Sequence, residues 1–484
     1  MKTIDQRTKN ADVAPARLSR NAKWALAGLS LSMLMSSLDT SIANAALPTL
    51  ALAFNASFQA VQWIVLAYLL SITALIVSAG RLGDMFGRRS LLITAIGLFT
   101  VASLLCGVAP SLGLLIAARA IQGLGAAVMM ALTVAFVGDT VPKAQTGSAM
   151  GLLGTMSAIG TTLGPSLGGL MIAGWGWRGI FLVNVPLGVL NIVLALRYLP
   201  AHQRQPKVLH SGFDLAGTLL LALSLSGYAL AMTLGRGHFS WINGSLLAAA
   251  FVGLGLFVIT EKQVAAPLIQ LTMLRQRALS AGLIMSVLVS TVMMTTLVVG
   301  PFYLSLALHL NTALLGLTLS CGPLCAALAG VPSGRLVDRF GAARMTLAGL
   351  VGIVSGAALL ALLPTTFGVT AYVLPMMLMT SCYALFQASN NTAIMGAAPQ
   401  DQRGVIAGML SLARNLGLIT GACAMGALFA WASGAADINT APPEALAHGM
   451  RMTFATAAAL IMMALGLAVR SQMPGRADTA FREA

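Results

Sequence analysis

Apolar stretches of about twenty residues alternate with short polar stretches along most of the chain. A helix needs about 20 mainly apolar residues to cross the hydrocarbon core of a bilayer. Measured with this length, the pattern predicts fourteen membrane-spanning helices. They are expected near residues 24–50, 61–80, 91–109, 112–137, 148–173, 180–199, 215–234, 246–260, 279–302, 313–332, 345–363, 372–395, 405–432 and 452–469.

Two parts of the pattern repeat. The segment Gly80–Gly87 returns as Gly334–Gly341, and the spaced glycines that begin at Gly147 return 257 residues later from Gly404. The repeat predicts two related six-helix halves with two extra helices between them, an all-α membrane protein of 6 + 2 + 6 helices. Such repeats are typical of transporters that work by alternating access around a central site. The expected divisions are a tail at 1–23, a six-helix bundle at 24–200, two additional helices at 213–261, a second bundle at 278–470 and a tail at 471–484.

Composition supports this reading, because 58% of the residues are hydrophobic and only 8% are charged. A soluble domain carries about 25% charged residues. The net charge of +15 does not indicate a nucleic-acid partner, since the charges lie in short clusters between apolar runs. With the N-terminus in the cytoplasm, the inside segments hold 23 of the 28 Lys and Arg and the outside loops hold three. This bias predicts that both termini are cytoplasmic. The first apolar run is too long for a signal peptide, so we expect it to remain as a helix.

One acidic residue, Asp39, lies deep in a predicted helix. Acidic residues inside a membrane are costly and usually functional, although a satisfied contact between helices would also explain it. Asp39 shares a small, polar helix face with Ser32 and Ser36, and we expect this face to line a cavity. We expect Asp39 to bind and release a proton.

Two basic residues also fall inside predicted helices. Arg119 lies at a depth similar to that of Asp39, and we expect the two to pair, with Gln122 on the same face. The alternative is that Arg119 only anchors packing through backbone carbonyls. Arg414 is expected to be a second buried cation, and the sequence places no acid near it.

The repeated loop is expected on the cytoplasmic side, where it could act as a latch between the halves or only as a positively charged anchor. Its residues are Gly80, Arg81, Gly83, Asp84, Gly87, Arg88 and Arg89, with Gly334, Arg335 and Asp338 in the second copy. On the fifth helix, glycines spaced by four clear one face for a close partner, and a proline adds a kink. This group is Gly160, Gly164, Pro165, Gly168 and Gly169.

Polar residues on other helices are candidates for a substrate cavity, with ordinary packing as the alternative. They are Asn44, Gln122, Phe386 and Asn390. The chain has no Gly-Lys pair and hence no P-loop, so nucleotide hydrolysis is not expected. Neither a metal site nor a catalytic site is expected, and the five cysteines match no zinc spacing.

Five motifs in order resemble the major facilitator superfamily, and specifically its fourteen-helix drug:proton antiporter branch. They are Leu38–Pro48, Gly80–Arg89, Arg119–Gly125, Gly160–Gly169 and Trp177–Pro186. The resemblance implies proton coupling at the fourth-helix motif and export for the fifth-helix motif. It covers nearly the whole chain. The sequence departs from the branch in the second loop copy, and Ser320–Pro323 stands where some relatives carry a further acid.

The function expected from these residues and this resemblance is export of small lipophilic compounds, which we expect to be cationic, in exchange for protons, as in multidrug efflux. The energy source would be the proton-motive force, with no cofactor. We expect the chain in a bacterial inner membrane, with the lipid bilayer, protons and a small molecule as its partners, and no nucleotide. The sequence does not decide whether a periplasmic adaptor takes part. The alternatives are a dedicated exporter of an amino acid, sugar or siderophore, and a non-transporting membrane sensor.

Overall fold

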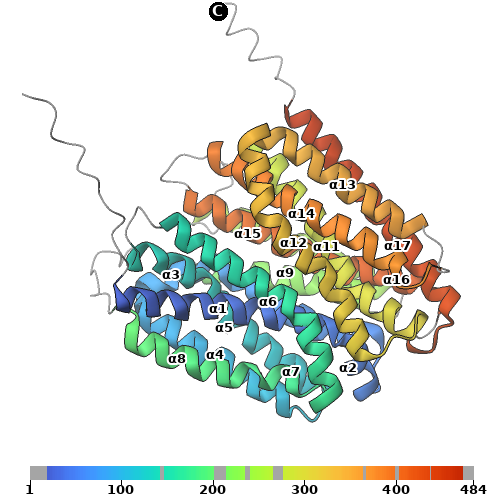
Figure 1. The fold of residues 1–484 in the computed structure, drawn as a ribbon, viewed down its shortest axis with the longest axis horizontal. Helices are drawn as coiled ribbons and strands as arrows, with labels where there is room; N and C mark the ends of the chain where they lie inside the picture. The colour runs from blue at the N-terminus through green and yellow to red at the C-terminus, as the bar shows by residue number, and fades with distance from the viewer. Residues whose placement is uncertain are drawn as a thin grey trace, which may run out of the picture.

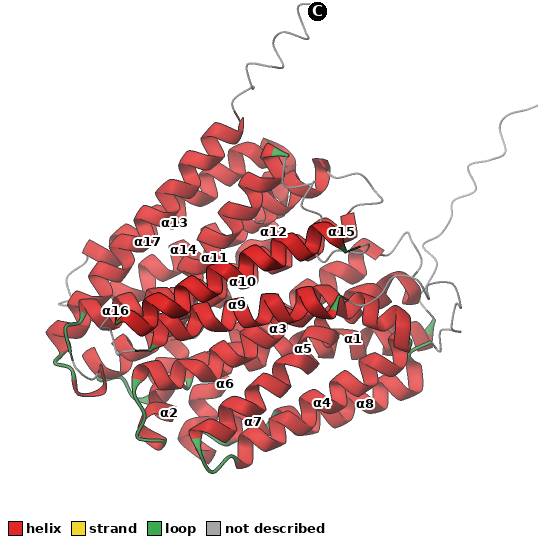
Figure 2. Cartoon of the chain, turned by 180° about the vertical axis from the view of Figure 1, so that it is seen from behind, coloured by secondary structure: helices red, strands yellow, loops and turns green. Residues whose placement is uncertain are grey.

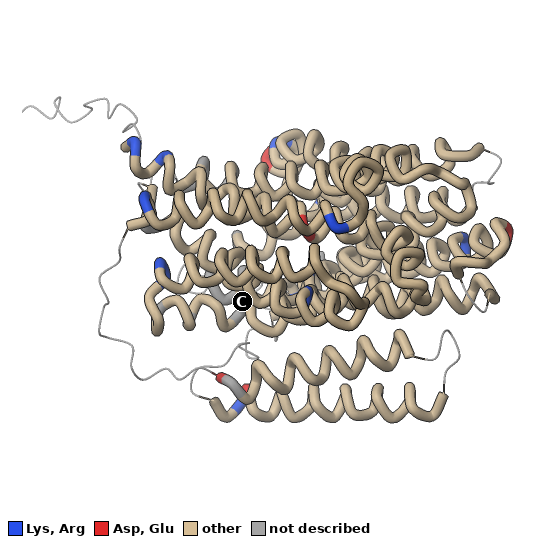
Figure 3. The backbone as a smooth tube through the Cα atoms, turned by 90° about the horizontal axis from the view of Figure 1, so that it is seen from below, with Lys and Arg blue, Asp and Glu red and all other residues tan. Residues whose placement is uncertain are grey.

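The computed structural model describes residues 19–141, 146–200, 214–234, 240–264, 276–362, 367–397, 403–435 and 438–472. Fourteen helices in this part of the chain are long and apolar enough to cross a membrane. Their tubes are uncharged over most of their length, and the charged positions gather toward the ends (Figure 3). The fold prediction of fourteen helices in two bundles with an inserted pair is confirmed by these helices and their arrangement.

The first bundle is formed by α1 (Arg20–Ala45), α2 (Leu47–Ala53), α3 (Phe58–Phe86), α4 (Arg88–Val108), α5 (Leu112–Thr140), α6 (Thr146–Trp175), α7 (Gly179–Leu182) and α8 (Asn184–Tyr198). The expected first helix is thus two helices, because α1 stops at Ala45 and α2 begins just before Pro48. Proline has no N–H to continue a helix and is favoured in the first turn of a new one.

The second bundle is formed by α11 (Arg277–Phe302), η3 (Tyr303–Ala307), α12 (Thr312–Phe340), α13 (Ala342–Leu362), α14 (Thr370–Ala397), α15 (Arg403–Thr420), η5 (Gly421–Met425), α16 (Gly426–Ala432), η6 (Ile438–Thr440) and α17 (Pro443–Gln472). Figure 1 shows the two bundles as separate groups of helices, blue to green and yellow to red. We call the end where α1 begins and α17 ends the termini end, and the opposite end the far end.

The inserted pair, α9 (Leu215–Thr233) and α10 (Trp241–Gln263), lies outside both bundles, in front of them in Figure 2. Two hydrogen bonds attach it to α3. The indole N–H of Trp63 donates to the hydroxyl of Thr233 at 3.0 Å, and the hydroxyls of Ser78 and Thr218 are 3.1 Å apart. The pair therefore forms an additional outer layer.

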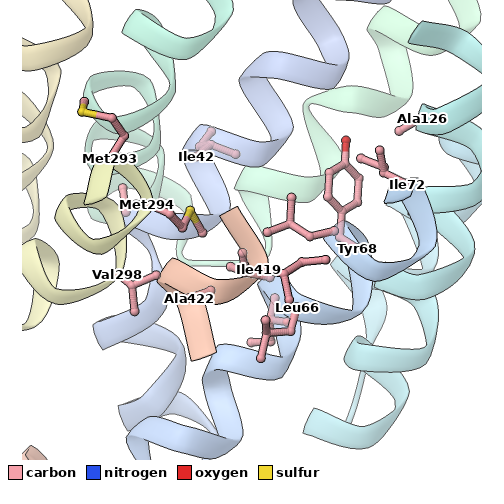
Figure 4. Close-up of a cluster of buried hydrophobic side chains, with 14 of the residues drawn as sticks. Ile42, Leu66, Tyr68, Ile72, Ala126, Met293, Met294, Val298, Ile419 and Ala422 are labelled. Carbon is pink, nitrogen blue, oxygen red and sulfur yellow. The ribbon is translucent and has the colours of Figure 1, made fainter. Parts of the chain in front are cut away.

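The bundles meet at the far end. The ring of Phe58 on α3 packs edge-on against Phe302 and Phe429, with centroids 4.6 and 5.7 Å apart. The side-chain amide of Gln62 donates to the carbonyl of Ala422 at 2.9 Å. Figure 4 shows the continuation of this contact, where Ile419 of α15 lies close to Leu66 of α3.

A second contact between the bundles joins α6 to α12, also at the far end. Gly316 of α12 lies directly against the backbone of Pro165 and Gly169 of α6. Nearer the termini end, a Cβ built at Gly154 of α6 or Gly330 of α12 would meet no atom within 4 Å. The ribbons of α6 and α12 diverge in that direction (Figure 1). The bundles are thus in contact at the far end, and α6 and α12 separate toward the termini end.

Candidate transport site

Asp39 lies at the centre of a buried polar cluster inside the first bundle. Its side chain has 0% exposure. One carboxylate oxygen pairs with Arg119 of α5. The other accepts hydrogen bonds from the side-chain amides of Gln122 and Asn184, both at 2.8 Å. Three helices, α1, α5 and α8, therefore contribute to one carboxylate.

Arg119 is as completely buried as Asp39 and is held from several sides. Its Nε donates to the carbonyl of Ile64 on α3 at 3.0 Å, and its Nη1 also donates to Gln122 at 2.6 Å. The guanidinium stacks over the ring of Tyr68, 4.2 Å from the centroid, which adds a cation–π contact. Its Nη2 is buried with no hydrogen-bond partner among the described residues.

Gln122 connects the ion pair to α4. Its amide N–H₂ also donates to the hydroxyl of Ser103 at 2.8 Å, and Ser103 donates in turn to the carbonyl of Phe99. A network of this kind is strong when every member is satisfied and costly when one is lost. The cluster therefore depends on the protonation state of its one acid.

The chemical consequence follows from charge balance. Asp39 and Arg119 together are neutral, which is what makes their burial tolerable. A proton on Asp39 would leave Arg119 as an uncompensated buried charge, and loss of one partner of a buried pair costs about 3–5 kcal/mol. Protonation of this one carboxyl would therefore favour a rearrangement that gives Arg119 new partners.

The α1 face expected to line a cavity is instead buried within the first bundle. Ser32 accepts a hydrogen bond from Asn191 of α8 at 2.8 Å, and the Ser36 carbonyl accepts from Tyr68. The partly exposed residues of this stretch include Ser37 and Thr40, about a quarter turn from that face. The prediction failed because a small, polar helix face suits tight packing against polar neighbours as well as it suits water.

The four substrate-cavity candidates do not come together. Asn44 is buried and donates to the carbonyl of Thr40, and Gln122 belongs to the Asp39 cluster. Phe386 packs against Gly349 inside the second bundle. Asn390 donates to the carbonyl of Gly282 and lines a cavity of about 160 Å³ at the termini end of that bundle.

The glycines of α6 allow close contact with two different helices, α1 and α12. Cβ atoms at Gly160 and Gly164 would come within 2.6 Å of Leu34 and 2.5 Å of Ser41, so these glycines let α6 approach α1. Gly168 does the same at Ile42. Pro165 and Gly169 face the other way, against α12. This helix therefore joins the Asp39 helix to the second bundle.

In both copies of the repeated loop, the first glycine is not packed against another described part of the chain. Gly87 and Gly341 have φ of +89° and +85°, which a residue with a side chain rarely adopts. Cβ atoms at Gly80 and Gly334 would meet nothing within 4 Å, whereas Gly83 packs against Leu132 within the first bundle.

The hydrogen bond of Arg89 lies within the first bundle. Arg89 donates to the carbonyl of Leu196, and Arg335 and Asp338 are exposed. Arg88 is partly buried, and the side chains of Arg81 and Asp84 lie outside the described part. A latch between the halves therefore stays a prediction for another conformation.

Two further differences concern single residues. Arg414 is exposed, so the prediction of a second buried cation was wrong. Asn184 was missed as a site residue, although it stands in the motif Trp177–Pro186. Its seven-residue spacing to Asn191 on an otherwise apolar helix was a usable signal, since both amides face α1. Within the described residues, no group of three His, Cys, Asp or Glu could hold a metal.

Curated relatives include transporters with multidrug names. The chain is 33% identical over 426 residues to the multidrug resistance protein Stp of Mycobacterium tuberculosis, covering 86% of this chain and 78% of Stp. It is 32% identical over 395 residues to the uncharacterized transporter YebQ of Escherichia coli, covering 80% and 85%. It is 29% identical over 409 residues to the riboflavin transporter RibZ of Clostridioides difficile, covering 84% and 88%.

Solved structures share the fold at low sequence identity. The D-xylose-proton symporter matches with a TM-score of 0.67 and 14% identity, over 93% of this chain and 97% of that one. A bacterial homologue of the lysosomal transporter Spinster, in an inward-facing conformation, matches with a TM-score of 0.66 and 14% identity, over 94% and 98%. The family model of the Major Facilitator Superfamily matches residues 29–422. The chain therefore belongs to the Major Facilitator Superfamily, and its relatives place it with the multidrug-efflux transporters rather than with any enzyme.

Proposed function

We propose that this protein exports small lipophilic molecules in exchange for protons, by alternating access between its two bundles. The observation that carries the proposal is the buried Asp39–Arg119 pair, whose charge balance changes when Asp39 takes up a proton. The multidrug names of its relatives support export of lipophilic compounds. The distribution of Lys and Arg supports cytoplasmic termini in a bacterial inner membrane, which makes the termini end the cytoplasmic end.

Energy magnitudes are consistent with coupling at this pair. Moving a two-state equilibrium from 1:99 to 99:1 needs about 5.5 kcal/mol. The cost of leaving Arg119 unpaired is about 3–5 kcal/mol. A potential of 100 mV contributes about 2.3 kcal/mol for each proton that enters. One proton binding at Asp39 is therefore of the right size to bias the bundles between two arrangements.

The tight contact of α6 with both α1 and α12 offers a route for this bias. Rearrangement around Asp39 would move α1, and α1 lies against the glycines of α6. The same helix touches Gly316 of the second bundle through Pro165 and Gly169. Movement of α1 would therefore alter the far-end closure.

A dedicated metabolite exporter is the second candidate, and one relative favours it, because RibZ carries the name of a riboflavin transporter. The expectation of a cationic cargo gains no support from Asp39, since its carboxylate is fully enclosed by protein donors. Competition between unrelated lipophilic compounds in vesicles would favour the first candidate. Inhibition by one compound class alone would favour the second.

The decisive experiment replaces Asp39 by Asn. Asn cannot change charge, so Asp39→Asn should abolish substrate-dependent proton release from inverted vesicles, to below about 1% of the wild-type rate. Asn also leaves Arg119 uncompensated, so a second variant, Asp39→Leu with Arg119→Leu, removes both charges and should fold yet remain uncoupled. Full proton-coupled efflux by either variant, with normal protein in the membrane, would disprove the coupling role.

A further inference from the structure

Arg414 is a charged residue inside a membrane-spanning helix. It takes no part in the proton-coupling cluster. It lies eleven residues after Arg403, the first residue of α15, which is about 16 Å along the helix. The membrane-spanning stretch begins at Gly408, so Arg414 lies six residues, or about 9 Å, inside the end of this stretch. It is exposed, and no hydrogen bond or ion pair joins it to another described residue.

The direction in which Arg414 points follows from the neighbours of α15. Gly417 lies against α11, where a Cβ would come within 2.7 Å of Ser290. Beyond it, Ala422 contacts α3 through Gln62. Thr420, the last residue of α15, and Cys423 interact with Tyr228 of the outer helix α9. Six residues, or about one and two-thirds turns, separate Thr420 from Arg414, so Arg414 lies on a different side of α15 from the side that faces α9.

Internal symmetry gives the same direction. With the offset of 257 residues, Arg414 corresponds to Ser157 of α6, as Gly417 corresponds to Gly160. The Ser157 hydroxyl lies 2.6 Å from that of Ser37 on α1, both residues are partly exposed, and α6 and α15 are the helices through which each bundle contacts the other, at α12 and α3. Arg414 therefore faces the region between the bundles rather than the lipid.

No acidic side chain among the described residues is placed there to neutralise Arg414. Among the described membrane-spanning helices, Asp39 is the one acid that lies more than two residues from a helix end. Asp39 is fully enclosed and paired with Arg119. The surface between the bundles thus carries a fixed positive charge with five N–H donors, for which the described part of the chain provides no acceptor.

We propose that Arg414 binds an acidic group of the transported molecule, so that the cargo is a lipophilic compound with a carboxylate. This inference rests on the proposed export function and specifies its substrate class. A planar guanidinium binds a carboxylate through two parallel hydrogen bonds. Export of a monoanion against an entering proton also moves both charges in the direction that an inside-negative potential favours.

The test compares two probes that share one ring system and differ in charge, pyrenecarboxylate and pyrenemethylammonium. Equilibrium binding to the full chain in detergent micelles is followed by fluorescence anisotropy. Wild-type protein should prefer the carboxylate, and Arg414→Gln should weaken its binding about tenfold, the size expected for a charged hydrogen bond. Binding of the ammonium probe should not change.

Two matched variants complete the experiment. Arg414→Lys keeps the charge and should stay within about threefold of wild type. Arg470→Gln removes an exposed arginine near the end of α17 and should bind as wild type does. Equal binding of both probes by wild type, no binding of either, unchanged carboxylate binding by Arg414→Gln, or loss of both probes together would each overturn the proposal.

The binding measurement uses no proton gradient, so its failure is separate from failure of the proposed function. If the charge preference holds while vesicles show no proton exchange, only the antiport proposal fails. If proton exchange holds and the charge preference is absent, Arg414 acts only as an anchor that extends toward the cytoplasmic end.

Discussion

At the scale of single residues, the cluster around Asp39 distributes one negative charge over three donors from two other helices, α5 and α8. Arg119 supplies the compensating charge, while Gln122 and Asn184 hold the second carboxylate oxygen. The amides also fix the orientation of the carboxylate, since they bind the oxygen that Arg119 does not. Removing either donor should therefore affect both stability and coupling.

Asn184 provides a direct test of this arrangement. Asn184→Ala removes a charged hydrogen bond, and we expect a loss of about 1.5–3 kcal/mol in stability, seen as a lower unfolding temperature in detergent. Asn191→Ala on the same helix removes a neutral hydrogen bond to Ser32 and should cost about 1 kcal/mol. Equal losses for the two variants would show that the Asn184 amide does not interact with a charged carboxylate.

The sequence predicted the two charged members of this cluster but not its uncharged members Asn184 and Ser103. Asp39 and Arg119 stand out because charge is rare in apolar helices, and similar depth suggested that they could meet. Asn184 and Ser103 are ordinary polar residues, and their role follows from the packing of α8 against α1 and of α4 against α5. The prediction that Arg414 is buried was wrong, because its position along the helix does not show whether its side chain lies inside a bundle or on the surface of that bundle.

At the scale of elements, α6 is the helix on which both bundles depend. Its glycines Gly160 and Gly164 allow backbone contact with α1, and Gly169 allows contact with α12. The helix pattern predicted a close partner for the glycine face, and the structure identifies two. Sequence alone could not assign the partners. Glycines at every fourth residue show which helix face lacks side chains, but they do not show which helix packs against that face.

Gly164→Ala tests this close packing. The new Cβ would come within 2.5 Å of Ser41 and 2.9 Å of the backbone nitrogen of Ile42, so α1 and α6 must separate. We expect a cost of about 1–3 kcal/mol in thermal stability, together with reduced efflux.

Gly154→Ala is the matched control on the same helix, since its Cβ would meet nothing within 4 Å. Alanine there should leave stability unchanged or raise it by up to about 1 kcal/mol, because alanine favours helix more than glycine does. A destabilisation of the same size at both positions would point to helix propensity or membrane insertion instead of α1–α6 contact.

At the scale of the whole molecule, closure depends on two far-end contacts, one on each side of the space between the bundles. Phe58 packs with Phe302 and Phe429 on one side, and Gly316 lies against α6 on the other. Toward the termini end the bundles separate (Figure 1). The two arrangements required for alternating access would differ mainly in which end is in contact.

Gly316→Ala should shift this equilibrium. A Cβ at this position would overlap the Pro165 carbonyl, so the far-end contact should weaken and the open-far-end population should rise. Spin labels at Trp175 and Trp431, both highly exposed, would report a longer mean distance in pulsed electron resonance. Gly330→Ala, where a Cβ meets nothing within 4 Å, should leave that distance unchanged. An unaltered distance distribution in Gly316→Ala would contradict this account of closure.

The outer pair α9 and α10 makes the two sides of the molecule unequal. It is bonded to α3 through Trp63 and Ser78, and α9 also reaches Cys423 beside the α3–α15 contact. No described helix outside the bundles covers the α6–α12 contact in the same way. A compound dissolved in the lipid therefore meets a screened seam on one side and an uncovered one on the other. We therefore expect any lateral entry of a compound from the bilayer on the α6–α12 side, because the inserted helices cover the other lateral seam of a pseudo-symmetric transporter.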